Sequence, residues 1–141
     1  MAPKDPDCIF CKILAGDIPC AKVFESDTCL AFLDIAPVNA GHTLVLTKGH
    51  YPTLMDIPAE LGSDLTAALS QVGKAVMEAT GADGLNLIQN NYEAAGQLVH
   101  HAHFHLIPRH SDDGLKLWPQ SGYENPEEMS RLAETIAGLL K

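Results

Sequence analysis

The chain has 141 residues, 46% of them hydrophobic, and this length predicts one domain with its own core. The formal net charge is −9, from 18 acidic and 9 basic residues. Binding along nucleic acid needs clustered Lys and Arg, so this charge argues against a nucleic-acid surface but leaves a single nucleotide open as a ligand. There is no signal-peptide pattern and no apolar run near the ~20 residues that span a bilayer, so we expect a cytoplasmic protein without a membrane partner.

The first part of the chain predicts a short helix followed by a hairpin. The helix is expected from about Cys8 to Ala15, and Gly16 suits its C-terminus. Residues 21–35 alternate as a hairpin does, with a turn at Ser26 and Asp27. The helix should direct three side chains inward, namely Ile9, Phe10 and Ile13.

Two further strands and a long helix are expected in the middle of the chain. Residues 37–41 predict a loop, residues 42–47 alternate as a strand, and residues 84–90 predict another strand. Residues 58–79 carry apolar side chains at helical spacing, and Gly81 suits the end of this helix. The residues that set the spacing are Leu61, Leu65, Leu69, Val72 and Val76.

The C-terminal part predicts an irregular segment and then an amphipathic helix. Residues 111–124 are polar and contain Trp118, so we expect either a mobile segment or one that crosses to a partner subunit. Asn125 supplies a helix cap, Pro126 a first turn and Glu128 an acidic residue at the third position. The apolar side of this helix consists of Met129, Leu132, Ile136, Leu139 and Leu140.

These elements predict an α+β fold in a single domain that spans residues 1–141. We expect an antiparallel sheet of about five strands with one long helix packed on it, a short N-terminal helix and a C-terminal helix. The core should lie in residues 8–110, followed by the C-terminal segment and helix in residues 111–141.

The stretch from residue 96 to residue 109, GQLVHHAHFHLIPR, holds four of the seven histidines. His101, His103 and His105 are separated by single apolar residues, which is the period of a strand with one polar face. Alternate residues on a strand stand about 6.5 Å apart, so the middle ring can act on a ligand while its neighbours contact the same ligand. This geometry suits phosphate chemistry; the alternatives are purely structural histidines or a metal site made of all three.

The sequence has four cysteines but no secretory pattern, so a disulfide framework is not expected. Cys8 and Cys11 form a Cys-x-x-Cys pair, which supplies two thiolates of a tetrahedral zinc site if two further ligands are found. The alternative is a buried pair on a helix. Cys20 and Cys29 are expected to be ordinary small apolar residues.

The segment GQLVHHAHFHLI resembles the signature of the histidine-triad (HIT) superfamily, which is His-x-His-x-His followed by two apolar residues, with Gly-Gln upstream in nucleotide-binding members. The similarity covers most of residues 8–110, so it implies a HIT-like fold of the zinc-carrying bacterial type. The other similar segments are CIFCKILAGDIPCAKVFESD, LAFLDIAPVNAGHTLVLTKGH and LIQNN.

The resemblance implies a catalytic role for four histidines. His103 would be the nucleophile that forms a nucleotidyl intermediate, with a backbone carbonyl holding its other ring nitrogen. His105 would donate to the phosphate oxygens, His42 would position the triad or move a proton, and His101 would complete the triad. Gln97 and nearby backbone N–H groups would stabilise developing charge.

The resemblance also assigns contacts to a substrate. Asp34 would accept hydrogen bonds from the ribose, with a purely strand-end role as the alternative, while Ile35 would flank the base and Asn90 would contact the phosphate or the leaving group. Many nucleotide-binding members carry Ser or Thr where Leu98 stands, so a hydroxyl contact is missing and only the backbone N–H is kept. The remaining expected contacts are Phe10, Gly96, Gln97, Leu98 and His105.

Zinc-carrying members complete the Cys8 and Cys11 pair with residues that correspond to His50 and His101, so the resemblance implies a structural zinc and no catalytic metal. The alternative leaves His50 as a surface residue. The resemblance further implies a homodimer that pairs through the long helix and an edge strand.

The implied function is hydrolysis or transfer at the α-phosphate of purine nucleotide conjugates of AMP or GMP, with adenosine phosphoramidates as the type substrate. One alternative is a dinucleoside polyphosphate hydrolase, which uses the same nucleophile. An alternative of another class is a nucleotide-binding regulatory module with little turnover, and the intact triad argues against it.

Overall fold

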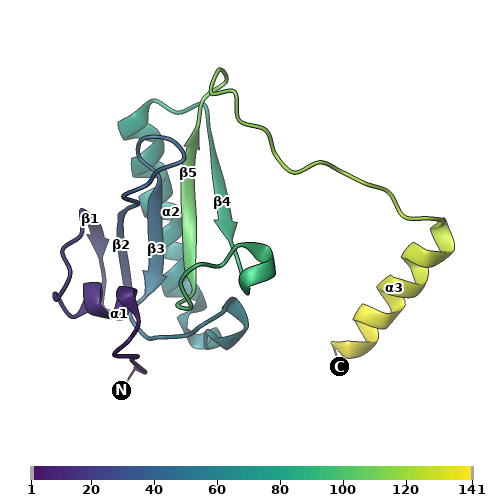
Figure 1. Ribbon diagram of the computed structural model, residues 1–141, viewed down its shortest axis with the longest axis horizontal. Helices are drawn as coiled ribbons and strands as arrows, with labels where there is room; N and C mark the ends of the chain where they lie inside the picture. Colours follow the sequence, from purple (N-terminus) through teal and green to yellow (C-terminus); the bar gives the residue numbers. More distant parts are fainter. Residues whose placement is uncertain (1, 141) are drawn as a thin grey trace.

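The structure, a computed structural model, describes residues 2–140 and confirms the predicted α+β fold (Figure 1). Its main elements in chain order are α1 (Ile9–Leu14), β1 (Lys22–Glu25), β2 (Cys29–Leu33), β3 (Thr43–Thr47), α2 (Gly62–Thr80), β4 (Gly84–Gln89), β5 (His103–Arg109) and α3 (Pro126–Leu139). The five strands form one antiparallel sheet in the order β1-β2-β3-β5-β4. Short 3-10 helices are η1 (Leu54–Asp56), η2 (Ala59–Leu61) and η3 (Glu93–Ala95).

The helix α2 covers one face of the sheet and buries the larger core. It ends at Gly81, which adopts the left-handed conformation (φ 63°), as the sequence predicts. It begins at Gly62 and not at Pro58, because residues 59–61 form the separate turn η2. Cys29 is fully buried in this core as expected, whereas Cys20 is exposed. The buried core residues are Cys29, Ala31, Val45, Leu65, Ala68, Val72, Val76, Phe104 and Leu106.

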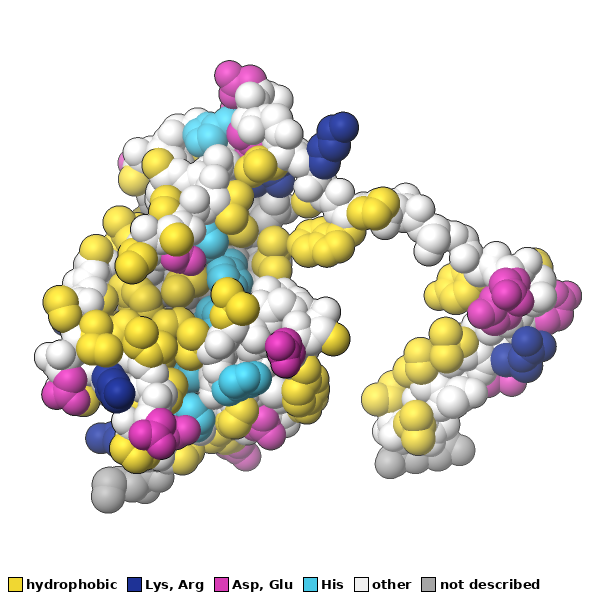
Figure 2. Space-filling view, in the orientation of Figure 1, with side chains coloured by type: hydrophobic (Ala, Val, Ile, Leu, Met, Phe, Trp, Pro, Cys, Tyr) yellow, Lys and Arg dark blue, Asp and Glu magenta, His cyan; other side chains and the backbone are white. Residues whose placement is uncertain are grey.

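The opposite face of the sheet carries α1 and a line of histidine side chains, with hydrophobic side chains beside them (Figure 2). Cys8 caps α1 by accepting a hydrogen bond from the Cys11 N–H at 3.4 Å. Phe10 and Ile13 pack inward as predicted, but Ile9 is 47% exposed, so that expectation is wrong. Ile9 is the first residue of α1, and its side chain lines an open cavity on this side of the sheet and does not pack in the core.

The strand that carries the triad begins later than the alternation of residues predicts. β5 pairs with β3 from His103 onward, and His101 lies in the bend before it. At this point the carbonyl of Thr47, the last residue of β3, accepts a hydrogen bond from Nε2 of the His101 ring at 2.8 Å and so is not used by the ladder. The prediction that one strand carries all three triad residues is therefore wrong for His101, although its ring lies on the α1 side of the sheet, with its centroid 6.0 Å from that of Phe10. The ring centroids of His103 and His105 lie 5.0 Å apart.

Residues 111–140, the C-terminal arm, leave the sheet and end in α3, which stands apart from the rest of the chain (Figure 1). Arg109 and Asp113 fix the start of the arm with two guanidinium–carboxylate bonds of 2.8 and 3.1 Å. Asn125 caps α3 as predicted, accepting the Glu128 N–H at 2.8 Å. The apolar side of α3 is exposed. Among residues 2–140, no helix is both long and apolar enough to cross a bilayer.

Candidate active site and metal centre

A cavity of about 300 Å³ lies on the histidine side of the sheet, between α1, the end of β2 and the loop before β5. A larger cavity of about 470 Å³ lies beside α2, but no ionisable side chain lines it. The smaller cavity therefore has the groups that acid–base or nucleophilic chemistry needs. The predicted site residues that line it are Phe10, Asp34, Ile35, Asn90, Gly96, Leu98, His103 and His105.

His103 is held as a neutral imidazole with one free ring nitrogen. Its Nδ1 donates to the carbonyl oxygen of His101 at 2.7 Å, which places the ring proton on Nδ1. Nε2 therefore keeps its lone pair, on a ring that lines the cavity. Burial lowers the pKa of His103, so the ring stays uncharged near neutral pH. This is the state of a competent nucleophile.

His42 and His105 form a directed hydrogen-bond pair beside the nucleophile. The Val38 N–H donates to Nδ1 of His42 at 3.1 Å, so the proton of this ring lies on Nε2. That Nε2 donates to Nδ1 of His105 at 2.9 Å, which leaves the His105 proton on its own Nε2. Burial, and then the neighbouring His103 and His42 rings, lower the pKa of His105 to about 4. His105 can therefore donate a hydrogen bond to a ligand while it is uncharged.

Asp34 follows β2 and faces the histidine pair. Its Oδ1 accepts the Ala36 N–H at 2.9 Å, which is the strand-end role, and its Oδ2 lies 3.7 Å from Nε2 of His42. Asp34 also lines the cavity, so the strand-end bond and a ligand contact are compatible. Ile35 is 97% exposed at the cavity wall and offers apolar surface to a planar group.

The loop between β4 and β5 forms the remaining wall of the cavity through Asn90, Gly96 and Leu98. Gly96 has a φ of 92°, a conformation that favours glycine, and a Cβ at this position would lie 3.8 Å from Nδ2 of Asn90. Leu98 is 90% exposed, so the position without a hydroxyl is open to a ligand.

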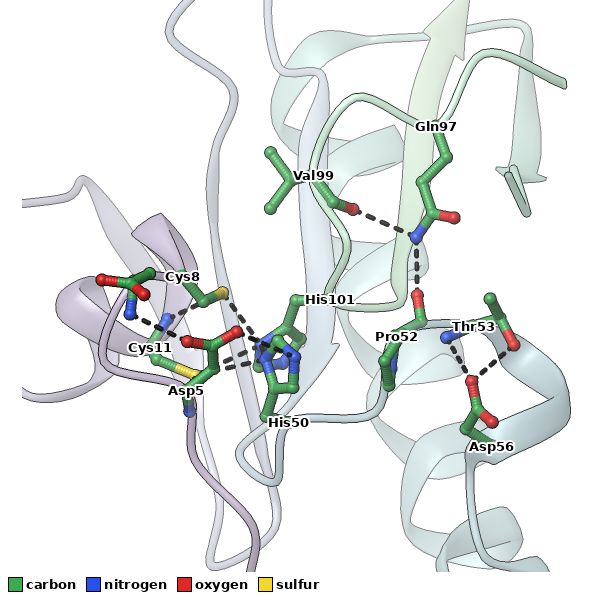
Figure 3. A network of polar contacts seen from close by, with 11 residues as sticks. Asp5, Cys8, Cys11, His50, Pro52, Thr53, Asp56, Gln97, Val99 and His101 are labelled. Atoms are coloured by element: carbon green, nitrogen blue, oxygen red, sulfur yellow. Dashed lines mark hydrogen bonds and ion pairs between the residues drawn. The ribbon is translucent and has the colours of Figure 1, made fainter. Parts of the chain in front are cut away.

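The structure does not bring the Gln97 side chain into the cavity. Gln97 is 2% exposed, and its Nε2 donates to the carbonyls of Pro52 at 2.6 Å and Val99 at 3.1 Å (Figure 3). Its Oε1 accepts the Tyr92 N–H at 2.7 Å. These bonds tie the loop before β5 to the segment after β3. Gln97 therefore supports the loop. Its backbone N–H also donates within the loop, to the Tyr92 carbonyl at 3.1 Å, so neither the side chain nor this N–H is free for the predicted role in charge stabilisation.

Four predicted side chains, Cys8, Cys11, His50 and His101, meet beside α1 and are called the metal cluster below (Figure 3). Their ligand atoms all lie within 4.8 Å of one another. Nδ1 of His101 is 3.6 Å from Sγ of Cys8, 3.7 Å from Sγ of Cys11 and 3.3 Å from Nδ1 of His50. Tetrahedral zinc, with bonds of ~2.3 Å to sulfur and ~2.0 Å to nitrogen, places S and N about 3.5 Å apart and two N about 3.3 Å apart. The spacing of the cluster therefore fits a zinc-sized ion.

The His101 ring is oriented to act as a metal ligand. Its Nε2 donates to the Thr47 carbonyl at 2.8 Å, so Nδ1 is unprotonated and faces the other ligand atoms. Burial lowers the pKa of His101 to about 4 and raises the pKa of the Cys8 thiol, and a bound cation would favour the thiolate. The cluster could hold a metal ion. His50 belongs to the cluster, so the alternative of His50 as a separate surface residue does not apply.

A second group of side chains also has ligand atoms within 4.8 Å of one another but does not suit a metal. It consists of Asp34, His42 and His105. Nε2 of His42 carries the proton, because Nδ1 accepts the Val38 N–H. A metal on Nε2 would move that proton to Nδ1 and set it against the Val38 donor. The geometry is therefore that of a proton-bearing pair beside a carboxylate.

Two groups that fix these tautomers were missed by the sequence analysis, the Val38 N–H and the Thr47 carbonyl. Every residue type presents the same backbone groups, so no side-chain pattern could have identified them.

The family model for the HIT domain matches residues 15–112, which include all the histidines of the cavity and of the metal cluster. The chain belongs to the HIT family.

Several relatives of this HIT protein have the names of nucleotide hydrolases. It is 42% identical over 136 residues to adenosine 5'-monophosphoramidase hnt1 of Schizosaccharomyces pombe, a match that covers 95% of this chain and 98% of the relative. It is 44% identical over 109 residues to adenylylsulfatase HINT3 of Arabidopsis thaliana, which covers 77% of this chain. The match spans 55% of the length of that plant relative.

Solved HIT structures resemble this one closely. SMU.412c from Streptococcus mutans UA159 is 41% identical, with a TM-score of 0.93 over 100% of this chain and 90% of that one, so the similarity includes the C-terminal arm. A zinc-bound histidine triad family protein from Mycobacterium smegmatis is 36% identical, with a TM-score of 0.74 over 95% of each chain.

Proposed function

We propose that this HIT protein hydrolyses purine nucleotide conjugates at the α-phosphate, with adenosine phosphoramidates as the preferred substrate class. The observation that carries the proposal is the 2.7 Å bond from Nδ1 of His103 to the His101 carbonyl, because it leaves a neutral lone pair on a ring of the cavity. The names of the fission yeast and plant relatives support the same class of reaction.

In the proposed complex, the nucleoside lies between α1 and the end of β2. Asp34 accepts hydrogen bonds from the ribose hydroxyls, and Ile35 and Phe10 contact the base. Asn90 and the backbone around Gly96 contact the phosphate. The support for this arrangement is that all five residues line one cavity together with His103 and His105.

The proposed reaction has two displacement steps. Nε2 of His103 attacks phosphorus, the bond from phosphorus to the leaving nitrogen breaks, and the amine departs with one proton taken up from solvent. Water then attacks the nucleotidyl-histidine, returns one proton to solvent, releases the nucleoside monophosphate and restores the neutral ring. The N–H of His105 donates to a phosphate oxygen while charge develops, and its bond to His42 offers a path for the proton.

We also propose that the metal cluster holds one structural zinc ion. The ion would tie α1, which carries Cys11 and is capped by Cys8, to His50 after β3 and to His101 before β5. The support is the tetrahedral spacing of the ligand atoms and the zinc-bound Mycobacterium smegmatis relative. Bound there, zinc contributes to folding and takes no direct part in the displacement.

A substrate panel tests the proposed function. Wild type, His103→Ala and His100→Ala are assayed with an adenosine phosphoramidate, adenosine 5'-phosphosulfate and a diadenosine polyphosphate. We expect the phosphoramidate to be cleaved fastest by wild type and not at all by His103→Ala. His100 is exposed and outside the cavity, so His100→Ala is the matched control.

Two outcomes of this panel would contradict the proposal. Faster cleavage of the diadenosine compound would identify a dinucleoside polyphosphate hydrolase. Tight binding of nucleotides with negligible turnover of every compound would identify a regulatory module instead.

The exposed apolar surfaces lead us to propose a homodimer in which the C-terminal arm crosses to a second copy of the chain. β4 is an edge strand with Leu87 exposed, and the apolar side of α3 is unpartnered among the described residues. Arg109 and Asp113 fix the start of the arm, and α3 stands apart from the sheet of its own subunit (Figure 1). The Streptococcus mutans relative, which matches over the whole chain, supports this placement of the arm.

Light scattering after size exclusion tests the dimer. We expect twice the mass of the chain for wild type, and the mass of one chain for a variant with both Leu132→Asp and Ile136→Asp, because the two charges lie on the apolar side of α3. Glu134→Ala is the control on the same helix. A wild-type protein with the mass of one chain would contradict the dimer.

A further inference from the structure

The metal cluster and the nucleophile meet at one residue, His101. Nδ1 of its ring faces the other ligand atoms of the cluster, while its carbonyl oxygen accepts the Nδ1 proton of His103 at 2.7 Å. The ring is fully buried and is held on its other side by the Thr47 carbonyl at 2.8 Å. One residue therefore serves the cluster with its side chain and the nucleophile with its backbone.

Strand pairing does not hold the His101 carbonyl in place. The ladder between β3 and β5 begins at His103, which pairs with Leu46, and His101 lies in the bend before it. The Ala102 N–H belongs to the same planar peptide unit as the His101 carbonyl, and it donates to the Tyr51 carbonyl at 2.7 Å. Tyr51 directly follows His50, so the direction of the His101 carbonyl depends on where both histidines of the cluster are held.

A second contact joins the cluster to the nucleophile through α1. Phe10 lies between the two cysteines of the cluster in sequence and is buried. Its ring meets the His103 ring edge-on, with centroids 4.9 Å apart and an interplanar angle of 87°, and lies 6.0 Å from the His101 ring. A movement of α1 that displaces the cysteines must therefore also change the packing against His103.

We propose that occupancy of the metal cluster sets the tautomer and orientation of His103, with His101 and Phe10 as positioning residues. When the cluster is occupied, the His101 ring is fixed, its carbonyl stays aligned, and His103 keeps its proton on Nδ1. When the cluster is empty, α1 and the His101 ring relax, and His103 also adopts the tautomer with the proton on Nε2, which cannot attack phosphorus. The coupling rests on the proposed zinc, and its effect on turnover rests on the proposed hydrolysis; the change in His103 needs no substrate.

Nuclear magnetic resonance of protein with 15N-labelled histidine tests this coupling, because long-range 1H–15N spectra report the tautomer of each ring. The spectra are compared for protein with zinc, with cadmium in its place, and after chelation. We expect a single His103 tautomer with zinc, a shifted signal with cadmium because its longer bonds move the ligand atoms, and averaged tautomers after chelation. His110 lies outside the cluster and the cavity and should not shift.

Two variants of His50 distinguish the effect of losing the metal from the effect of replacing the His50 side chain. His50 belongs to the cluster but does not line the cavity, and its ring contacts Cys11 and His101. His50→Ala removes one ligand, whereas His50→Cys keeps four ligands of the kinds that zinc accepts. We expect averaged tautomers of His103 in His50→Ala and the zinc-bound tautomer in His50→Cys. For the phosphoramidate, kcat should fall on the order of 10-fold or more in His50→Ala, while the Kd of AMP changes little.

Near-UV circular dichroism shows which samples are folded. An unchanged His103 signal in the zinc, cadmium and folded metal-free proteins would overturn the coupling, as would its loss in zinc-bound His50→Cys. If chelation and His50→Ala unfold the chain, the coupling is tested by comparing the His103 signal of the folded zinc-bound protein with that of the folded cadmium-bound protein. If His103 responds to the metal but no nucleotide is cleaved, the proposed function fails and the coupling stands.

Discussion

Nε2 of His42 lies 2.9 Å from Nδ1 of His105, and the Val38 amide sets the direction of the proton between the two rings. As a result, His105 turns an N–H toward the cavity, whereas His103, 5.0 Å away between ring centroids, turns a lone pair toward it. Two neighbouring rings of the same residue type thus have opposite hydrogen-bonding roles. The backbone groups that hold them cause this difference, since burial lowers the pKa of both rings.

The first prediction concerns the nucleophile. His103→Ala should abolish turnover while leaving nucleotide affinity largely intact, because most ground-state contacts are expected from Asp34, Ile35 and Asn90. Rapid quench of the wild type should trap a nucleotidyl adduct on His103 when its hydrolysis is slower than its formation. Substantial activity in His103→Ala, or activity that disappears and returns with a metal, would mean that the mechanism is wrong.

The second prediction concerns the hydrogen-bond pair. His105→Asn should lower kcat by ~10²-fold, which is less than the effect of His103→Ala, because His105 stabilises charge and forms no covalent bond. His42→Phe should lower kcat by a similar factor, since His105 then has no partner that fixes its proton on Nε2. Steady-state kinetics on the phosphoramidate measure both. If His105→Asn lost kcat as completely as His103→Ala, the covalent role would have been assigned to the wrong ring.

The third prediction concerns the metal. Protein purified without chelators should carry about one zinc per subunit, and its removal should lower the free energy of unfolding by more than about 3 kcal/mol, because the ligands join three separate segments. Cys8→Ser should have the same effect as removal. Cys20→Ser is the control, since Cys20 is exposed and outside the cluster. Native mass spectrometry and denaturant unfolding measure these effects, and a metal-free protein of undiminished stability would contradict them.

The fourth prediction concerns pH. Burial lowers the pKa of His105 to about 4 in the folded protein, from 6.5 in a free side chain. Between pH 4 and pH 6.5, His105 binds more protons in the unfolded chain than in the folded protein. The contribution of His105 to the free energy of unfolding is therefore complete above pH 6.5 and is lost as the pH falls toward 4. The free energy of unfolding should therefore rise with pH in this window. The slope per histidine is at most about 1.4 kcal/mol per pH unit, and less for a ring that is partly exposed like His105.

Denaturant unfolding at pH 5 to 7.5 measures this slope. In His105→Asn the slope should be shallower, because one group that resists protonation has been removed. His100→Ala should keep the slope of the wild type. An equal slope in wild type and His105→Asn would show that His105 does not contribute.

The fifth prediction concerns the cavity wall. Leu98→Ser should raise kcat by a few-fold, because it restores a hydroxyl that can hydrogen-bond near the reacting group. Stability should change little, since Leu98 is exposed. Leu98→Ala, which has no hydroxyl, is the matched control. An equal gain in Leu98→Ala would attribute the effect to space and not to the hydroxyl.

The fold was predictable because its signals are local. Gly81 marks the end of α2, Asn125 marks the start of α3, and the turn at Ser26 separates β1 from β2, each through backbone or capping chemistry that acts within a few residues. The start of β5 was not predictable in this way. The alternation of His101 with His103 has the period of a strand, and only the position of Thr47 on the neighbouring strand decides where pairing stops.

The site was predictable as a set of residues but not as a set of contacts. The resemblance to the HIT superfamily named eight of the residues that line the cavity and the four of the metal cluster, and the structure brings each of these two groups together. It also named Gln97, whose carboxamide bonds to Pro52 and Val99 instead of facing the cavity. A glutamine beside a ligand and a glutamine that holds a loop have the same sequence signal, so only three-dimensional contacts distinguish them.

The bond between Arg109 and Asp113 has a consequence for how the C-terminal arm can vary. It anchors the arm at one end, and residues 115–124 then run without helix or strand to α3. An extended chain covers about 3.3 Å per residue, so removing two residues would draw α3 back by about 7 Å, which is more than one helical turn. Such a chain would keep every side chain of both sites and still lose the placement of its last helix. For the proposed dimer, the number of residues in this segment therefore matters more than their identity.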